Sequence, residues 1–459
     1  MSKPLSNSQT RDIEALLHPY TDAVALRKTG SHLIERGEGI YVHDTEGRRY
    51  IEAMSGLWCA GLGFSNAELI EAAQAQLAKL PYYHVFTARG HEPAVELAEK
   101  IKALAPGMAR VFYQSSGSEA NETQVKLAWY YNNAVGRPEK KKIISRVKGY
   151  HGVTIVSASM TGLPNNHRDF DLPVDRILHT HTPHHWKGAE PGESEEDYAA
   201  RLAADLEALI LAEGPDTVAA FIAEPIMGAG GVILPPKGYF PAINAVCAKY
   251  DVRCISDEVI CGFGRTGAWF GHQALDYKVG SISMAKQLTS AYLPLSAVAI
   301  DAEMAEAVEA NSGKIGTFGH GFTYGGHPVA CAVGIKTLEI YERMDMPARV
   351  RELAPVFQGH LQRLAGHPLV GEARGMGLIG GLEVAPGKSP AGFAQPGRVG
   401  ARVAAEFNAR GVIPRAIGDT IAFCPPMIIT ADEIDEMFAP AEAALDAAAA
   451  WAKAEGLLA

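Results

Sequence analysis

The chain has few cysteines, no long apolar segment and no excess of positive charge, and each shortage excludes a class of protein. Its 459 residues include six cysteines and no CxxC pair, which excludes a disulfide scaffold and predicts reduced thiols. No stretch approaches the roughly 18 apolar residues of a membrane span, and the N-terminal segment has no apolar run typical of a signal peptide. Lys and Arg number 42 against 52 Asp and Glu, which argues against nucleic acid or an anionic membrane as the main partner. We therefore expect a cytoplasmic protein that binds neither.

The composition is that of a globular protein with room for a sizeable core. Hydrophobic residues make up 47% of the chain and charged residues 20%, with Gly and Pro spread along it. These proportions exclude intrinsic disorder, collagen and a coiled coil. The length allows roughly three units of about 150 residues, although large α/β enzymes often hold more than that in one domain.

Short apolar runs separated by helical or loop stretches predict a large α/β domain. The candidate strands are residues 110–113, 143–145, 218–223, 252–256, 281–284 and 297–300. Several are continuously apolar, as expected for parallel strands that helices cover on both faces. Apolar residues at helical spacing precede these strands, at 69–77 and 95–104. We expect residues 66–328 to form this large domain.

The two ends of the chain predict a smaller α+β domain. A hairpin is expected at 39–51. After residue 328, helices at 330–343 and 349–364 precede strands at 377–384, 411–415 and 420–423. Thr430 and Glu433 have capping-box spacing at the start of a late helix. We expect residues 1–65 to join residues 329–459 in this domain.

Polar residues that could carry chemistry follow four of the candidate strands. A Gly/Ser turn at 115–118 leads into a helix, and a helix N-terminus suits a phosphate group. Asp257 follows strand 252–256 and Lys286 follows 281–284. Glu224 follows 218–223, with a glycine-rich stretch at 228–231 behind it. Because ligands bind outside the carboxyl ends of strands in α/β sheets, these residues can converge.

A phosphate cradle, a carboxylate and an amine together suggest a site for pyridoxal 5'-phosphate. A desolvated lysine has a lowered pKa and is a competent Schiff-base nucleophile. The carboxylate can keep the pyridine nitrogen protonated as an electron sink, while the loop anchors the phosphate. Each residue alone also has a plainer interpretation, such as a Ser N-cap without a ligand or a surface lysine. The hypothesis therefore depends on the whole set.

Two other motifs resemble a dinucleotide-binding loop and a metal site, but their surroundings do not match either kind of site. Residues 262–267 match GxGxxG, but no clear helix follows them and no acidic residue lies about 20 positions on to bind a ribose. The segment HTHTPHHW at 179–186 contains His179, His181, His184 and His185, which resemble metal ligands. It has turns and no nearby Cys or paired carboxylate, so we expect a surface loop near the active-site entrance and no metal.

Six motifs in order resemble the signature of class III pyridoxal-phosphate aminotransferases. They are SSGSEANE (115–122), GYHG (149–152), AEPIMGAGG (223–231), SDEVICGFGRTG (256–267), SMAKQLTSAYLPLSA (283–297) and GFTYGGHPVACA (321–332). The resemblance runs from about Pro19 to the final helix. It implies an α/β chain of fold-type I, with a mostly parallel seven-stranded sheet in the large domain and a smaller α+β domain. It also implies a homodimer, with a tetramer left open, whose active sites lie at the subunit interface.

The resemblance implies a role for each matched residue. Lys286 is the Schiff-base lysine and Asp257 pairs with the pyridine nitrogen. The other cofactor-binding residues implied are Ser116, Gly117 and Ser118 at the phosphate, Tyr150 and Val259 on the two ring faces, His151, Glu224, and Thr323 reaching the phosphate from the partner subunit. The implied substrate-binding residues are the pocket walls Trp58, Phe86 and Ala229, and Arg415, which would pair with a substrate carboxylate.

Within the family, GLWC (56–59) and PRAIGD (414–419) look most like ω-transaminases that use pyruvate as amino acceptor. The implied reaction moves an amino group from a primary amine or ω-amino acid to pyruvate by a ping-pong Schiff-base mechanism, giving alanine and an aldehyde or ketone. Arg415 fits this reaction because a guanidinium can grip a carboxylate with two hydrogen bonds. The alternatives are a relative that uses 2-oxoglutarate, and an aminomutase or decarboxylase on the same scaffold.

Overall fold

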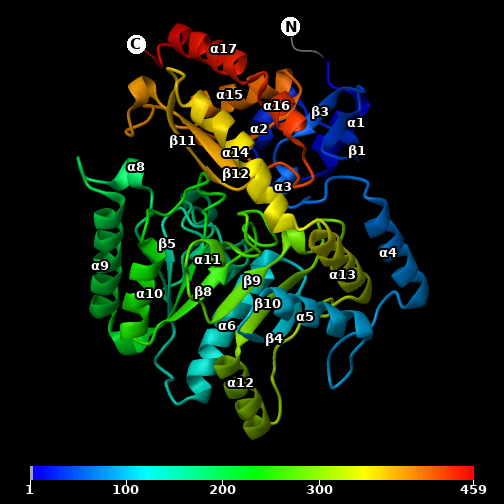
Figure 1. The fold of residues 1–459 in the computed structure, drawn as a ribbon, viewed down its shortest axis with the longest axis vertical. Coiled ribbons are helices and arrows are strands. Elements are labelled where there is room, and N and C mark those ends of the chain that lie inside the picture. Colours follow the sequence, from blue (N-terminus) through cyan, green and yellow to red (C-terminus); the bar gives the residue numbers. More distant parts are fainter. Residues whose placement is uncertain (1–3, 459) are drawn as a thin grey trace.

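A seven-stranded sheet forms the centre of the molecule (Figure 1). The computed structural model describes residues 4–458. The strands are β4 Met108–Gln114, β5 Lys142–Arg146, β6 Ile177–Thr180, β7 Val218–Ala223, β8 Arg253–Asp257, β9 Ser281–Met284 and β10 Ser296–Asp301. Their order is β4-β10-β9-β8-β7-β5-β6. Only β10 is antiparallel to its neighbours in this sheet of the described chain, so the expected mostly parallel α/β architecture is confirmed.

Helices cover both faces of this sheet. The helices of the region are α4 Ala67–Lys79, α5 Glu92–Leu104, α6 Gly117–Ala134, α7 Ile155–Met160, α8 His185–Gly188, α9 Glu195–Glu213, α10 Tyr239–Lys249, α11 Gly271–Ala274, α12 Ala302–Ile315 and α13 Pro328–Arg343. On one face α6 packs Val125 and Ala128 on Ile222 and Ile255. On the other, α9 and α10 pack on Phe221 and its neighbours. The apolar strands are buried on both sides, which explains their continuous hydrophobicity.

Two four-stranded sheets form a second region with the C-terminal helices. One has the order β1-β2-β3-β13 and the other β11-β12-β15-β14. The strands are β1 Ile34–Glu38, β2 Tyr41–Asp44, β3 Arg49–Glu52, β11 Val370–Met376, β12 Ile379–Val384, β13 Val412–Ile413, β14 Arg415–Ile417 and β15 Thr420–Phe423. The helices are α1 Asn7–Ala15, α2 Ala23–Thr29, α3 Ser55–Trp58, α14 Met346–Leu364, α15 Arg398–Ala409, α16 Ala431–Phe438 and α17 Ala441–Ala454.

The two ends of the chain meet in this second region. β3 pairs in parallel with β13, so that Ile51 lies opposite Val412 and Glu52 opposite Ile413. Figure 1 shows the blue N-terminal strands beside the orange and red C-terminal helices, above the large sheet. We propose on this basis that the described residues of 1–65 and 329–459 form a small domain and 66–328 the large one. The helix α13 begins at this boundary and packs on α4 and α5 of the large domain.

Most of the expected elements form, with local differences. The expected strands at 218–223, 281–284 and 420–423 have the observed bounds, and Thr430 caps α16 with Glu433 in a capping box. The single strand expected at 411–415 is two strands, β13 and β14. The strands β1, β6 and β11 are additional to the expected ones.

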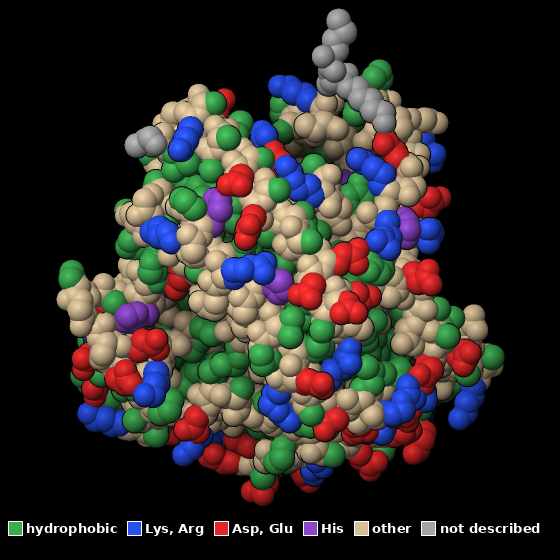
Figure 2. Space-filling model, turned by 45° about the horizontal axis from the view of Figure 1, so that its top comes forward, with side chains coloured by type: hydrophobic (Ala, Val, Ile, Leu, Met, Phe, Trp, Pro, Cys, Tyr) green, Lys and Arg blue, Asp and Glu red, His purple; other side chains and the backbone are tan. Residues whose placement is uncertain are grey.

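Positive and negative side chains are interspersed on the face that Figure 2 shows, and neither sign gathers there into one large patch. None of the helices within residues 4–458 is long and apolar enough to cross a membrane. All six cysteines are free thiols, as expected, and five of them are buried.

Candidate active site

The carboxyl ends of the central strands bring the expected residues together. Asp257 is the last residue of β8, Lys286 follows β9 by two positions, and Glu224 follows β7 directly. β4 leads through Ser115 into the N-terminus of α6. Because β7, β8 and β9 run parallel, their ends lie at one edge of the sheet, where ligands of α/β proteins bind.

The turn before α6 is built as an anion cradle. The Ser116 hydroxyl accepts the amide hydrogen of Glu119 at 3.2 Å, and the Glu119 carboxylate accepts the amide hydrogens of Ser115 and Ser116 at 2.7 and 3.1 Å. This capping box fixes the turn and leaves the amides of Gly117 and Ser118 at the helix N-terminus. Those amides and the helix dipole suit a phosphate.

Gly117 packs closely against Val259 beside this cradle. A Cβ atom on Gly117 would lie 3.1 Å from Val259 Cγ1, so a larger residue would displace the Val259 side chain. The Ser118 hydroxyl accepts the amide hydrogen of Val153 at 3.1 Å, which ties α6 to the segment after Tyr150. The expected phosphate and ring-packing residues therefore lie side by side.

Asp257 is buried and held by three donors. Its Oδ2 accepts hydrogen bonds from Asn121 Nδ2 at 2.7 Å and from His151 Nδ1 at 2.8 Å, while Oδ1 accepts the Val259 amide hydrogen at 3.1 Å. Only 3% of Asp257 is exposed. A carboxylate held in this way keeps a fixed orientation at the end of β8, and a second lone pair on Oδ1 can accept from a cationic ring nitrogen.

Lys286 is a half-buried amine in a strained backbone position. Its φ of 48° is left-handed, which is uncommon for a residue other than glycine and concentrates at functional sites. Burial lowers the pKa of Lys286, although Cys59, Asp257 and Glu224 nearby act in the opposite direction. A lowered pKa increases the neutral fraction of the amine, which is the form that attacks a carbonyl.

Glu224 links the two segments that flank the site. Its carboxylate accepts the amide hydrogens of Tyr150 at 2.9 Å and Gly228 at 3.0 Å, and burial raises its pKa. His151 is buried, and its Nε2 has no hydrogen-bond partner within residues 4–458. Buried polar atoms are rarely left unsatisfied, so this nitrogen indicates that a further group belongs in the site.

Arg415, at the start of β14, is half-buried next to Tyr150 and Tyr20. Burial lowers the pKa of Arg415, and no carboxylate within residues 4–458 forms an ion pair with it. Desolvated cations in proteins are usually paired. This guanidinium can therefore donate hydrogen bonds to an anionic ligand.

The expected pocket walls occupy different environments. Trp58 is 2% exposed and packs in a hydrophobic cluster with Ile226, Val232 and Ile260. Ala229 is half-buried in the glycine-rich loop after β7. Phe86 is 40% exposed and lies against Gly321. Thr323 is exposed in the loop between α12 and α13, where its carbonyl accepts a hydrogen bond from Tyr82.

Three residues of this site were not predicted from the sequence. Asn121 lies within a quoted motif, one and a half turns after Ser116 on α6, but its contact with Asp257 spans 136 positions. Tyr20 reaches Tyr150 and Arg415 from the N-terminal segment. Arg146, at the end of β5, donates to the Glu224 carbonyl. Helical spacing could have indicated Asn121, whereas nothing local indicates the other two.

The residues of both competing motifs make internal contacts in the described chain. The GxGxxG stretch is a loop, and its Arg265 is fully buried and donates to the carbonyls of Leu378 and Pro425. The expected surface loop at 179–186 is wrong in part. His179 lies in β6, and His184 is buried because it pairs with Glu372 of β11 at 2.7 Å. No group of three or more potential metal ligands occurs within residues 4–458.

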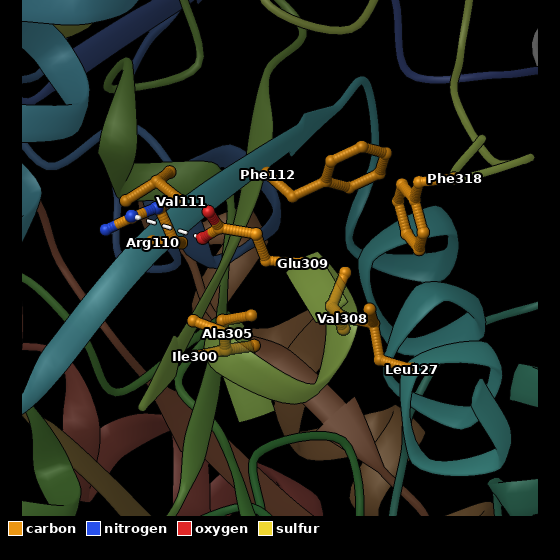
Figure 3. A pocket seen from close by; sticks show the side chains of 9 residues that line it. All are labelled: Arg110, Val111, Phe112, Leu127, Ile300, Ala305, Val308, Glu309 and Phe318. Carbon is orange, nitrogen blue, oxygen red and sulfur yellow. Dashed lines mark ion pairs between the residues drawn. The ribbon is translucent and has the colours of Figure 1, made fainter. Parts of the chain in front are cut away.

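A separate hydrophobic cavity of about 200 Å³ lies between β4, β10, α6 and α12 (Figure 3). The rings of Phe112 and Phe318 meet edge to face at 5.9 Å, and Arg110 and Glu309 form an ion pair at 3.8 Å. It contains none of the candidate site residues.

The residues at the strand ends fit pyridoxal 5'-phosphate. The α6 cradle can hold its phosphate, the Val259 side chain beside it can pack on a planar ring, and Asp257 and Lys286 can contact the ring nitrogen and the aldehyde. His151, whose Nε2 is unpartnered, belongs to the same group of buried polar residues because its Nδ1 donates to Asp257.

The chain is similar to known proteins over most of its length. Residues 24–445 match the family model described as Aminotransferase class-III. A γ-aminobutyrate transaminase 1, mitochondrial, of Oryza sativa subsp. japonica is 50% identical over 425 residues, covering 92% of this chain and 82% of that protein. A γ-aminobutyrate transaminase 3, chloroplastic, of Solanum lycopersicum is 47% identical with the same coverage.

Solved structures superpose over almost the whole chain. The omega transaminase from Pseudomonas jessenii in complex with PMP is 50% identical with a TM-score of 0.96, covering 97% of this chain and 99% of that one. A thermostable omega transaminase variant engineered for synthesis of enantiopure bulky amines is 49% identical, also with a TM-score of 0.96, covering 97% and 100%.

Proposed function

We propose an activity for this chain, which belongs to the class III aminotransferases and is a pyridoxal-phosphate-dependent aminotransferase. We propose further that it takes the amino group from a primary amine or ω-amino acid and gives it to pyruvate. The products are then an aldehyde or ketone and alanine. The observation that carries this proposal is the unpaired, half-buried guanidinium of Arg415 beside Tyr150.

Different residues of the chain would have different roles in the reaction. The bound cofactor supplies a carbonyl for the amino group and a cationic ring that withdraws electrons. Lys286 provides the amine that holds the cofactor and then carries a proton to and from the substrate carbon. Asp257 keeps its negative charge directed at the ring nitrogen, because Asn121, His151 and Val259 fix its carboxylate. The α6 cradle anchors the phosphate.

Arg415 would select the amino acceptor. Its guanidinium can form two parallel hydrogen bonds with the carboxylate of pyruvate or alanine. An amine without a carboxylate leaves this charge unpaired, so the same pocket must tolerate both states. The γ-aminobutyrate and omega transaminases among the relatives support an ω-amine donor.

Arg415→Ala should weaken the use of pyruvate and alanine far more than the use of a carboxylate-free amine. A lost charge-assisted pair costs about 1.5–3 kcal/mol, or roughly 10- to 150-fold in kcat/KM. Half-reactions followed separately would measure this effect. Arg410→Ala is the matched control because Arg410 lies on the surface and pairs with Glu406. Equal losses for both substrate types would show that Arg415 is structural.

Trp58→Ala should change which amines react while leaving pyruvate nearly unaffected. The indole is buried beside Ile226 and Ile260, and its removal would open space on the amine side. We expect larger amines to gain at least about 10-fold in kcat/KM relative to small ones, since a fully buried aromatic ring excludes substrate by steric contact. Initial rates with donors of graded size would measure it. An unchanged ranking of donors would contradict the assignment.

We propose that the working unit is a homodimer with shared active sites. Tyr82, Tyr83, Val85, Phe86 and Tyr324 are hydrophobic side chains that this single chain leaves 38–64% exposed. Clusters of this kind mark interfaces. Tyr82 and Tyr324 pack edge to face at 5.9 Å, and Tyr82 donates to the carbonyl of Thr323, so the cluster includes the segment expected to reach the partner's phosphate cradle.

Dilution of the holoenzyme to monomers should release cofactor and abolish activity together. Thr323→Val removes the hydroxyl with little change in shape, so we expect weaker cofactor binding by about 10-fold, equivalent to one lost hydrogen bond to an anion. Sedimentation and cofactor absorbance would follow both quantities. A monomer with full activity would contradict shared sites.

The compartment is also a proposal. The curated relatives carry mitochondrial and chloroplastic names. The six free thiols of this chain suit a reducing compartment, and we propose the cytoplasm. Fractionation of source cells would test this.

A further inference from the structure

Trp58 depends on a strained turn for its position. Three of the four residues from Ser55 to Trp58 have left-handed backbone angles: φ is 49° at Ser55, 68° at Gly56 and 67° at Trp58. Left-handed angles at Ser and Trp cost free energy, so the surrounding structure must impose them. We therefore expect the backbone of this turn to change conformation when the contacts that stabilise it are removed.

The carboxylate of Glu52 stabilises this turn through hydrogen bonds. Glu52 ends β3 and is 6% exposed. Its Oε2 accepts the amide hydrogens of Met54, at 3.3 Å, and of Gly56. These two amides lie at the start of the turn, so one carboxylate oxygen takes the place of two absent backbone partners.

A second set of contacts fixes one end of the turn to the rest of the molecule. The Ser55 hydroxyl donates to the Cys424 carbonyl at 2.7 Å, and Arg265 Nη2 lies 3.4 Å from the Ser55 oxygen. The Trp58 amide donates a hydrogen bond to the Met54 carbonyl at 2.8 Å. Between these fixed points, Gly56 has only Glu52 as a side-chain partner within residues 4–458.

We propose that Glu52 is a positioning residue for amine specificity: by accepting the amides of Met54 and Gly56, it fixes the turn that places Trp58 in the pocket wall. This inference rests on the proposed function, because it requires Trp58 to limit the size of the amine. Glu52 acts through Trp58 and needs no contact with substrate or cofactor.

Ionisation of Glu52 gives the proposal a distinctive readout. Burial raises the pKa of Glu52 to about 7, and the two backbone amides act in the opposite direction. The titratable groups that face Glu52 are the thiols of Cys59, directly after the turn, and of Cys424, after β15. The positive charges of Arg265 and Lys286 act to lower the pKa of Cys424. No Lys or Arg within residues 4–458 pairs with Glu52. Below pH 7 the carboxyl is protonated, and its hydrogen bonds from the amides lose their charge assistance.

The experiment compares two amine donors of equal pKa that differ only in the size of one substituent. The ratio of their kcat/KM values, large over small, is measured with the holoenzyme at pH 6 and pH 8. Ionisation of Lys286 and of the cofactor affects both donors alike and cancels in the ratio. For the unaltered protein we expect the ratio to be at least threefold higher at pH 6, where the turn is looser.

Glu52→Gln keeps the shape of the side chain and removes its charge. We expect a ratio that no longer depends on pH and equals the pH 6 value of the unaltered protein. Gly56→Ala is the second variant: a Cβ at Gly56 meets nothing within 4 Å, so it acts through backbone strain alone. It should raise the ratio at pH 8 in the same direction.

Gly39→Ala is the matched control, because Gly39 also has a left-handed φ, of 57°, with open space around its Cβ position. It should leave the ratio unchanged. At pH 8, a ratio within twofold of the unaltered protein in Glu52→Gln, or in Gly56→Ala if Glu52→Gln fails to fold, would overturn the inference when Trp58→Ala does alter the ratio. If Trp58→Ala has no effect either, the proposed amine pocket itself is wrong.

Discussion

Lys286→Ala should have no measurable turnover while it still binds cofactor weakly. The variant loses both the nucleophilic amine and the group that moves the proton, so we expect activity to fall by at least about 10⁴-fold. Phosphate contacts at the α6 cradle and the Asp257 carboxylate remain, so cofactor affinity should fall less than activity. Single-turnover kinetics and equilibrium dialysis would separate the two effects.

Chemical labelling identifies the lysine directly. Borohydride should remove the visible absorbance of the holoenzyme and attach the cofactor to the peptide that contains Lys286. Lys148 is the matched comparison, because burial lowers its pKa as well and it lies next to the GYHG motif. Labelling of the Lys148 peptide in place of the Lys286 peptide would overturn the assignment.

Asp257→Asn should slow the reaction by about 10³-fold or more, which corresponds to about 4 kcal/mol in the barrier. The substitution keeps the shape but removes the charge that stabilises a protonated ring nitrogen. It also places an amide donor where the carboxylate now accepts from Asn121 and His151 on one oxygen and from Val259 on the other. Rates of each half-reaction, corrected for bound cofactor, would measure the loss.

Asp251→Asn is the control for this substitution, because Asp251 is exposed and lies just before β8. It should retain normal rates. An Asp257→Asn variant within tenfold of the unaltered protein, with full cofactor content, would show that the carboxylate does not act on the ring nitrogen.

The sequence predicted the large sheet well because its strands are buried on both faces. The continuous apolar run of β7, for example, has the expected bounds. β6 was not predicted because His179 and Thr180 interrupt its apolar pattern, as is common in a strand at the sheet edge. β13 and β14 were expected as one strand because Pro414, which separates them, lies within an otherwise continuous pattern.

The candidate site could be predicted where residues follow strands, and not where contacts are remote in sequence. Asp257 and Lys286 are each next to a strand end, so their convergence follows from topology. The environment of Arg415 depends on Tyr20, almost four hundred positions away. His184 was expected on the surface, but its partner Glu372 is 188 positions distant and belongs to a strand that the sequence did not indicate.

Transfer of the amino group can be followed through its nitrogen atom. The purified holoenzyme is incubated with a ¹⁵N-labelled primary amine and either pyruvate or 2-oxoglutarate, and the labelled amino acids are measured by mass spectrometry. We expect ¹⁵N-alanine with pyruvate, in an amount equal to the aldehyde or ketone formed, and little ¹⁵N-glutamate with 2-oxoglutarate. Label found only in glutamate would place the enzyme with aminotransferases that use 2-oxoglutarate, and label found in neither amino acid would contradict amino transfer to a keto acid.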